Sequence, residues 1–279
     1  MKTNYHTHSY FCDGKQDPEA YIKTALSRGF TSLGFSSHAP VPAESDWTMK
    51  EENLPLYLNR IEELKGLYKD RIEIYLGLEI DYIPGKIGPS SPAFQDIGLD
   101  YRLGSIHFLK YKDEERYLTI DGPAAEFDDL LSGTFNNDIR KLIAHFHTLL
   151  RAMAAEHKFD ILSHFDLYKV HNKGEKRFQE NAQWHKDEII ETLEVIEKKD
   201  LIIEVNTGGW ARAKTDFLYP SKWILKQILA RGIPITINTD AHEPELLDAY
   251  YDKAVSVLKD LGFTEYMVLK KGSWIFQPL

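Results

Sequence analysis

Nine side chains of the types that bind metal ions recur along the chain, most of them directly after a short apolar run. They are His6, His8, Asp13, His38, Glu79, His107, His164, Asp240 and His242. Residues two apart in an extended strand face the same side, so His6 and His8 can reach one ion. Nine ligands are too many for one ion and suit two or three, with a carboxylate such as Glu79 bridging them. Mixed imidazole and carboxylate ligands favour Zn, Mn or Fe.

The elements that must position these side chains are predicted strands that alternate with amphipathic helices. Beyond a first apparent strand closed by His6 and His8, the strand-like runs are Thr31–Phe35, Ile72–Leu78, Tyr101–Ile106, Phe159–Leu162, Leu201–Val205 and Pro234–Ile237. Strand and helix alternation predicts a mainly parallel sheet with crossover helices. In a barrel of parallel strands, all carboxyl ends meet at one face. Six of these seven strand ends supply a His, Asp or Glu, all except the end of Leu201–Val205. They therefore predict one metal centre at that face.

The predicted helices show apolar residues at three- and four-residue spacing. They cover Pro18–Arg28, Leu56–Lys69, Asn137–His157, Ala182–Lys199, Ser221–Arg231 and Leu246–Leu261. Asp17 is the expected N-cap of the first helix, and Gly29 ends it. Two segments break the alternation: Pro84–Asp100 reads as a long loop, and Lys110–Thr134 reads as a polar insertion over one face. No linker or internal repeat divides the chain, so we expect a single domain over residues 1–279.

Four further histidines fall in helical stretches, and we expect packing or surface roles for most of them. They are His145, His147, His157 and His185. His145 and His147 are two apart on a helix, so they do not face the same way. The nine strand-end residues differ, because burying so many unpartnered polar groups at one barrel end would be costly unless they hold metal ions.

Composition narrows the classes of partner and the compartment. The chain has 279 residues, of which 43% are hydrophobic, and this suffices for one large core. Its net charge of −9 argues against nucleic acid or an anionic membrane as the main partner. A single cysteine, Cys12, excludes an intrachain disulfide, and the start of the sequence reads as neither signal peptide nor membrane anchor. We therefore expect a cytoplasmic protein. Its oligomeric state is not indicated.

The ordered motifs around these residues resemble the polymerase and histidinol phosphatase (PHP) superfamily. They are His6-Thr7-His8, Cys12-Asp13-Gly14, Ser36-Ser37-His38-Ala39-Pro40, Gly77-Leu78-Glu79, Gly104-Ser105-Ile106-His107, Ser163-His164-Phe165-Asp166 and Thr239-Asp240-Ala241-His242. Within it, the chain resembles the monofunctional histidinol-phosphate phosphatases. The added signs are Ser-His-Ala-Pro, Gly-Ser-Ile-His-Phe, Glu204-Val205-Asn206-Thr207 and Tyr219-Pro220-Ser221.

The resemblance implies a distorted, TIM-like (β/α)7 barrel that holds three divalent ions. One ion would be held by His6, His8, Glu79 and Asp240. Glu79 would bridge to a second ion, which His107 and His164 complete. The third would take Asp13, His38 and His242. Some members of the superfamily have His where this chain has Asp13, and Asp is still a good ligand.

The activity that the resemblance implies is hydrolysis of a small phosphate monoester. The expected substrate is L-histidinol phosphate, and the expected pathway is histidine biosynthesis. A hydroxide bridging two ions would attack phosphorus in line, and no covalent phosphoenzyme is required. Basic loop residues at the mouth should contact the phosphate, and the candidates are Arg212 and Lys169. A metal-bound water or Asp13 would protonate the leaving group. For the amine and imidazole of histidinol, the candidate acceptors are Asp166, Glu243 and residues of the insertion.

Three alternatives remain open at this point. The first is a phosphatase of the same fold that acts on another small ester, such as a sugar phosphate or nucleotide. The second is an amidohydrolase, a metal-bearing barrel that also opens with H-x-H but often has a bridging modified lysine where this chain offers Glu79. The third is a regulatory protein that kept the metal centre without catalysis.

Overall fold

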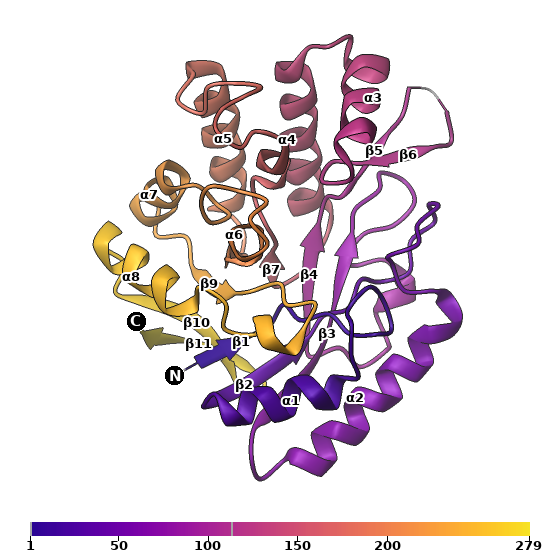
Figure 1. The fold of residues 1–279 in the computed structure, drawn as a ribbon, viewed down its shortest axis with the longest axis vertical. Helices are drawn as coiled ribbons and strands as arrows, with labels where there is room; N and C mark the ends of the chain where they lie inside the picture. Colours follow the sequence, from indigo (N-terminus) through magenta and orange to yellow (C-terminus); the bar gives the residue numbers. More distant parts are fainter. Residues whose placement is uncertain (1, 113) are drawn as a thin grey trace.

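Seven parallel strands form the central sheet of the computed structural model, which describes residues 2–112 and 114–279 (Figure 1). In spatial order they are β1 (Lys2–Asn4), β2 (Phe30–Phe35), β3 (Glu73–Asp81), β4 (Tyr101–Ser105), β7 (Ile161–Leu162), β8 (Ile202–Asn206) and β9 (Ile235–Asn238). Every neighbouring pair is parallel. All six predicted strand-like runs form strands, with ends that differ from the prediction by at most three residues.

The sheet curls until its first and last strands meet, so the barrel is nearly closed. Thr7 forms a parallel bridge to Ala241. The His8 amide donates to the Ala241 carbonyl at 2.9 Å, and the Ala241 amide donates to the His6 carbonyl at 3.2 Å. The predicted (β/α)7 barrel is thus confirmed. One detail was wrong: β1 ends at Asn4, so His6 and His8 lie beyond the strand, in backbone that is held by this bridge.

Helices cover the outside of the barrel (Figure 1). The longer ones are α1 (Pro18–Ser27), α2 (Leu54–Tyr68), α3 (Ala124–Phe135), α4 (Ile139–Glu156), α5 (Gln183–Ile196), α7 (Lys222–Ala230) and α8 (Tyr251–Leu261). As predicted, the Asp17 side chain caps α1 by accepting from the Glu19 amide. The predicted last helix began too early: residues 244–246 form the 3₁₀ turn η4 (Pro244–Leu246), and α8 begins after Tyr250, whose φ is +59°.

The end of the barrel away from the predicted metal site is filled by aromatic rings. The ring of Tyr101 lies against two strand glycines, since a Cβ at Gly34 or Gly77 would come within 2.4 to 2.5 Å of it. Its hydroxyl donates to the carbonyls of Tyr5 and Phe35. Because side chains fill the interior at this end, a cavity that could hold a substrate can lie only at the opposite, carboxyl end of the strands.

The two irregular segments differ in structure. Residues 84–100 contain one short turn, η2 (Pro92–Phe94), and are otherwise loop, as predicted. In the described part of the insertion, which leaves out residue 113, β5 (Phe108–Lys110) pairs antiparallel with β6 (Tyr117–Thr119), and α3 follows. A terminal hairpin of β10 (Glu265–Lys270) and β11 (Ser273–Pro278) was not predicted. The remaining short turns are η1 (Glu51–Asn53), η3 (Leu167–His171) and α6 (Gly208–Ala211). Across residues 2–112 and 114–279, no helix combines the length and apolar character needed to cross a membrane.

Candidate metal centre

All nine predicted ligands converge at the carboxyl end of the barrel. Their side-chain atoms form four overlapping groups in which the ligand atoms lie within 4.8 Å of one another. The groups are His6–His8–Asp240, His6–Glu79–His164, His38–Glu79–His107 and His8–Asp13–His38–His242. The structure therefore brings together all nine residues that the sequence predicted to share one site, although Glu79 lies inside β3 rather than after it.

Glu79 is at the middle of the cluster, and its two oxygens face different histidines. Oε1 lies 2.8 Å from His164 Nε2 and 3.8 Å from His107 Nε2. Oε2 lies 3.1 Å from His6 Nε2 and 2.9 Å from His38 Nδ1. The side chain is 1% exposed. This division of the two oxygens between two sets of imidazoles is the arrangement required of a bridging carboxylate.

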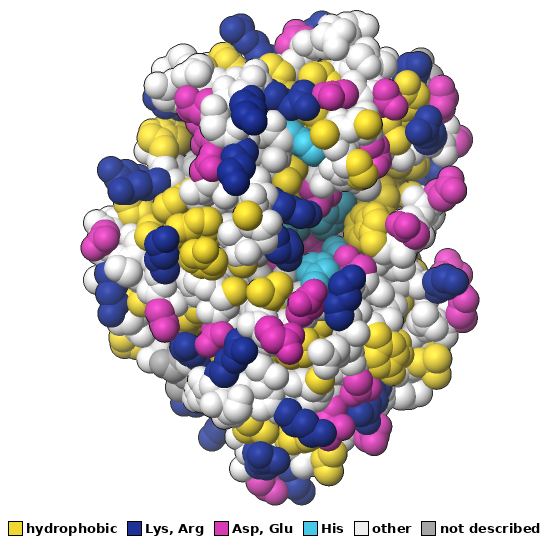
Figure 2. Space-filling model, viewed as in Figure 1, with side chains coloured by type: hydrophobic (Ala, Val, Ile, Leu, Met, Phe, Trp, Pro, Cys, Tyr) yellow, Lys and Arg dark blue, Asp and Glu magenta, His cyan; other side chains and the backbone are white. Residues whose placement is uncertain are grey.

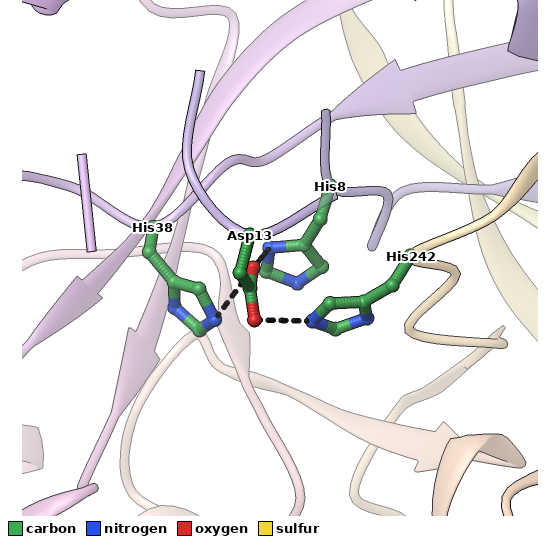
Figure 3. Close-up of side chains that lie close together, drawn as sticks. All are labelled: His8, Asp13, His38 and His242. Carbon is green, nitrogen blue, oxygen red and sulfur yellow. Dashed lines mark ion pairs between the residues drawn. The ribbon is translucent and has the colours of Figure 1, made fainter. Parts of the chain in front are cut away.

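Asp13 is the centre of a second, more open group, which Figure 3 shows with the three imidazoles pointing at its carboxylate. Asp13 Oδ2 is 3.1 Å from His242 Nε2, and Oδ1 is 3.8 Å from His38 Nε2 and 3.9 Å from His8 Nδ1. Asp13 comes from the turn after β1, His38 follows β2 and His242 follows β9. Three segments far apart in sequence thus supply one compact set of ligand atoms.

Asp240 is held in an unusual backbone conformation by Arg212. Its φ is +51°, in the left-handed region that favours glycine. Arg212 Nη2 lies 2.8 Å from the Asp240 carboxylate, and Nη1 donates to the Asp240 carbonyl at 2.7 Å. Asp240 Oδ1 in turn faces His8 Nε2 at 3.2 Å. Such strain, retained next to ligand-type residues, indicates that this carboxylate is positioned for function.

Two buried carboxylates, which the sequence analysis did not assign a role, hold the ligands from outside. Glu204, inside β8, accepts from His6 Nδ1 at 2.6 Å and from the His164 amide at 3.0 Å. Asp81, at the end of β3, accepts from the His107 amide at 2.8 Å, and its oxygens lie 3.1 and 3.2 Å from His107 Nδ1. Metal-binding histidines commonly donate their second ring N–H to such a carboxylate. The available sequence signal was a carboxylate within an otherwise apolar strand.

His8 has a sulfur partner instead. The Cys12 Sγ lies 3.6 Å from His8 Nδ1 and 3.5 Å from the Ser9 carbonyl. If the thiol donates to the Ser9 carbonyl, its sulfur can accept from His8 Nδ1–H. His8 Nε2, which faces Asp240, then carries no proton. Sulfur is a weak acceptor, and His8 is therefore held less firmly than His6 or His107.

The electrostatics of the cluster keep its carboxylates ionised and His8 neutral. Burial would raise the pKa of Glu79, but the positive charges of His6, His38 and His107 lower this pKa well below its usual range. Burial, followed by repulsion from His242 and His38, lowers the pKa of His8 to about 3. The carboxylates and His8 are thus in the protonation states that metal binding requires, whereas His6, His38 and His107 carry protons that bound ions would displace.

Five buried atoms of the cluster provide the test of whether metal ions fit. These atoms have no hydrogen-bond partner among the described residues. They are His6 Nε2, His8 Nε2, Asp13 Oδ1, His38 Nδ1 and Glu79 Oε2. Each orphaned atom in a dry site would cost free energy, because its water hydrogen bonds are lost without replacement. All five belong to the predicted ligand set, and they are nitrogen and oxygen donors suited to divalent ions. The residues present therefore fit a multinuclear metal centre.

The ligands open into a cavity of about 740 Å³ at the barrel mouth. Figure 2 shows histidine side chains at the base of this hollow, with basic and acidic side chains around it. Arg212 lines the cavity as predicted, and so does Lys214, which the sequence analysis did not consider. The structure does not bring Lys169 there: its Nζ is 3.5 Å from both Asp166 and Glu180, and it lines a separate pocket.

A nearly closed parallel barrel with a histidine and carboxylate cluster at its carboxyl end defines a metal-binding α/β-barrel protein. Comparison with protein families then gives the particular family. The model described as "PHP domain" matches residues 4–208. The chain therefore belongs to the PHP domain family.

Curated relatives cover nearly the whole chain. A protein of Deinococcus radiodurans named "Probable histidinol-phosphatase" is 27% identical over 92% of this chain and 92% of its own length. The histidinol-phosphatase of Bacillus subtilis is 27% identical over 87% of this chain and 94% of its own. Among solved structures, the histidinol phosphate phosphatase of Lactococcus lactis, complexed with Zn, L-histidinol and phosphate, covers 98% of both chains with 20% identity and a TM-score of 0.69. That likeness confirms the fold.

Proposed function

We propose that this chain hydrolyses phosphate monoesters at the metal centre, and that its substrate is L-histidinol phosphate, which it converts to L-histidinol and phosphate. The observation that carries the proposal is the set of nine converging ligands, with five orphaned buried atoms, at the base of one cavity. The relatives that share the length of the chain are named for this activity. We further propose that residues 1–279 form one domain and that the protein is cytoplasmic.

Three ions account for the geometry. His6, His8, Glu79 and Asp240 would hold the first, Glu79, His107 and His164 the second, and Asp13, His38 and His242 the third. Bound Zn, Mn or Fe ions would provide a water-derived nucleophile at neutral pH and would neutralise the phosphate oxygens. Glu79 supports a bridging role because Oε1 faces His164 of the second set and Oε2 faces His6 of the first, while Oε2 also lies 2.9 Å from His38 Nδ1 of the third set.

The chain's own basic groups would orient the phosphate. Arg212 lines the cavity and is fixed by Asp240, so its guanidinium is preorganised rather than mobile. Lys214 lines the same cavity two residues later and takes the second basic role that the sequence assigned to Lys169. Positioning and charge neutralisation are the main requirements of phosphoryl transfer.

Asp13 is better suited to metal binding than to proton donation. Burial would raise its pKa, but His242, His38 and His8 lower it well below its usual range. An ionised carboxylate cannot give a proton to the leaving alkoxide. We therefore assign Asp13 as a ligand, and the proton reaches the leaving group from solvent in the open cavity.

The test is phosphate release from protein whose metal content has been measured, with L-histidinol phosphate beside sugar phosphates, nucleotides and simple esters. We expect a strong preference for L-histidinol phosphate and its loss in His8→Ala. A preference for another ester would overturn the substrate and keep the phosphatase. No release from any ester, with metals bound, would overturn the proposed function.

A further inference from the structure

One side of the cavity is built from groups that the phosphate chemistry does not use. We name it the acidic wall and define it by Glu44, Asp46 and Trp47 from the loop after β2 and Asp121 and Glu126 from the insertion. It lies against the metal centre, because the Trp47 ring centroid is 4.5 Å from that of His38 and 5.3 Å from that of His107. His38, His107 and Glu79 line this same cavity, so a group bound against the wall would lie next to the candidate metal ligands.

The charge of the wall is opposite to what a phosphate would select. Apart from the metal ligands, the cavity is lined by five carboxylates, the fifth being that of Glu243, and by three cationic side chains: Lys15, Arg212 and Lys214. Arg212 is already paired with Asp240. Bound ions would attract the phosphate group, but the carboxylates would repel any further negative charge on the ester. They would attract a leaving group that is positively charged.

Asp121 is the carboxylate best placed to meet that positive charge. Glu126 is already engaged, since it accepts from the Thr119 amide at 2.6 Å and from the Thr119 hydroxyl at 3.1 Å. Glu44, Asp46 and Glu243 are exposed at the rim. Asp121 is half-buried and makes no hydrogen bond or ion pair with any residue that the structure describes, although its charge is felt at Arg212 and His107.

The position of the Asp121 backbone is fixed by the residue before it. The amide of the preceding residue, Ile120, donates to the His107 carbonyl at 2.8 Å, so the insertion is anchored to the metal-binding segment. Burial, followed by the negative charges of Asp121 and Asp166, raises the pKa of Tyr219, which lines the same cavity, well above its usual range. Asp121 itself lines the cavity, so its charge is available to a bound group there.

The wall also offers aromatic surface. Trp47 and Phe108 stack with their ring centroids 5.1 Å apart and their planes at 8°, and Tyr117 lines the cavity beside them. Aromatic faces attract organic cations, and a carboxylate at their side adds an ion pair. A flat or amine-bearing cation is the chemistry that matches both features.

We propose that Asp121 forms the ion pair with the positively charged part of the leaving group, so that the site selects phosphate monoesters of cationic alcohols. This inference rests on the proposed function and specifies the class of ester that the site accepts. The sequence analysis named Asp166, Glu243 and residues of the insertion as candidate acceptors for the amine and imidazole of the substrate. The proposal chooses the insertion among them. Asp166 is fully buried, and its carboxylate accepts from the Ser221 amide, away from this wall.

The test compares Asp121→Asn with the wild type on three ester classes: cationic (L-histidinol phosphate and O-phosphoethanolamine), neutral (glycerol 3-phosphate) and anionic (3-phosphoglycerate). The matched control is Asp128→Asn, which removes the same charge from the same insertion at an exposed position beside Arg177. We expect kcat/KM for the cationic esters to fall about 10-fold, mainly through KM, in Asp121→Asn alone. Neutral esters should be unchanged, and anionic esters should improve.

A binding measurement separates this inference from the proposed function. Calorimetry on metal-loaded protein needs no turnover, and we expect Asp121→Asn to weaken binding of L-histidinol but not of inorganic phosphate. An equal loss on all esters, or L-histidinol binding that is unchanged or already absent in the wild type, would overturn the role of Asp121. If the wild type prefers O-phosphoethanolamine to L-histidinol phosphate, the proposed substrate fails while the role of Asp121 stands.

Discussion

The barrel mouth and the space between α4 and α5 both bury histidines, and they do so in opposite ways. At the mouth, ring nitrogens of His6, His8 and His38 face carboxylates and each leave one buried atom without a hydrogen bond. Between the helices, both ring nitrogens of His147 are used, Nδ1 with the Thr192 hydroxyl and Nε2 with the Tyr168 hydroxyl, each at 3.1 Å.

His185 completes the helical network in the same manner. Its Nε2 is 2.9 Å from the Tyr168 hydroxyl, and its Nδ1 donates to the Glu180 carbonyl at 2.8 Å. The comparison teaches that burial of histidine does not identify a metal site. The distinguishing features are unpaired ring nitrogens that converge and carboxylates among them. The prediction from sequence that His147 and His185 have packing roles agrees with these contacts.

The largest contrast should come from removing one charge in each region. Glu79→Gln removes the bridging carboxylate, and we expect kcat/KM to fall at least about 1,000-fold with loss of bound metal. Glu188→Gln makes the same change on α5, beside Arg151 of α4, and should leave kcat/KM and the amount of bound metal unchanged. Kinetics and elemental analysis on the two variants check this. Full activity in Glu79→Gln would exclude it as the bridge.

A substitution of Glu204 tests whether the carboxylates that hold the ligand histidines from outside contribute to metal affinity. In Glu204→Gln, an amide nitrogen must face donors on His6, His164, Asn206 or Asn238. We expect metal affinity to fall about 10- to 100-fold, as for other partners of metal-binding histidines. Competition with a chromophoric chelator measures it. Unchanged affinity would mean that His6 is oriented by other contacts.

The helical network should respond in stability and not in metal binding. His147→Gln leaves the Thr192 or Tyr168 hydroxyl without its partner, which we expect to lower the free energy of unfolding by about 1 to 3 kcal/mol. Denaturant titration and metal analysis on the same sample check both parts. A loss of bound metal without a loss of stability would reverse the distinction between the two regions.

The pH dependence of stability should carry the signature of a buried neutral histidine. Burial, then His185 and Arg151, lower the pKa of His147 well below its usual value. Because the unfolded chain takes up that proton near pH 6.5 and the folded chain does not, stability is complete above about pH 6.5 and is lost below it. We expect the metal-free wild type to lose up to about 1.4 kcal/mol per pH unit more than His147→Gln in that range. Parallel slopes would contradict this.

The smallest effect should come from Cys12. Cys12→Ala removes the weak acceptor of His8 Nδ1, and we expect metal affinity to fall about 2- to 5-fold, less than in Glu204→Gln. Cys12→Ser keeps an acceptor and should lie between alanine and the wild type. The same chelator competition resolves the series. A serine variant weaker than alanine would show that the thiol contributes through packing instead.

The fold and the convergence of the nine candidate ligands could be predicted from sequence because both depend on local patterns. Apolar runs that alternate with amphipathic helices specify a parallel barrel, and residues after such runs must share one end. Long-range contacts could not be read in this way. Lys169 follows a strand, yet the turn η3 directs it to Asp166 and Glu180.

The missed positions share the same cause. Glu204 lies inside a strand, where its role depends on which ligands of neighbouring strands it contacts. Asp121 lies in an insertion whose hairpin pairing decides that it reaches the cavity. The hairpin of β10 and β11 was not predicted because it covers the aromatic end of the barrel, and such a long-range contact leaves no local pattern in the sequence. Trp274 of this hairpin packs edge-on to Tyr5.

The most direct test of the central claim is to titrate metal-free protein with Zn or Mn while counting the ions bound per chain and the phosphate released from L-histidinol phosphate in the same samples. We predict no release without metal, and release that rises as the centre fills to three ions. Release from the metal-free chain, or a filled centre that releases none, would contradict a metal-dependent phosphatase.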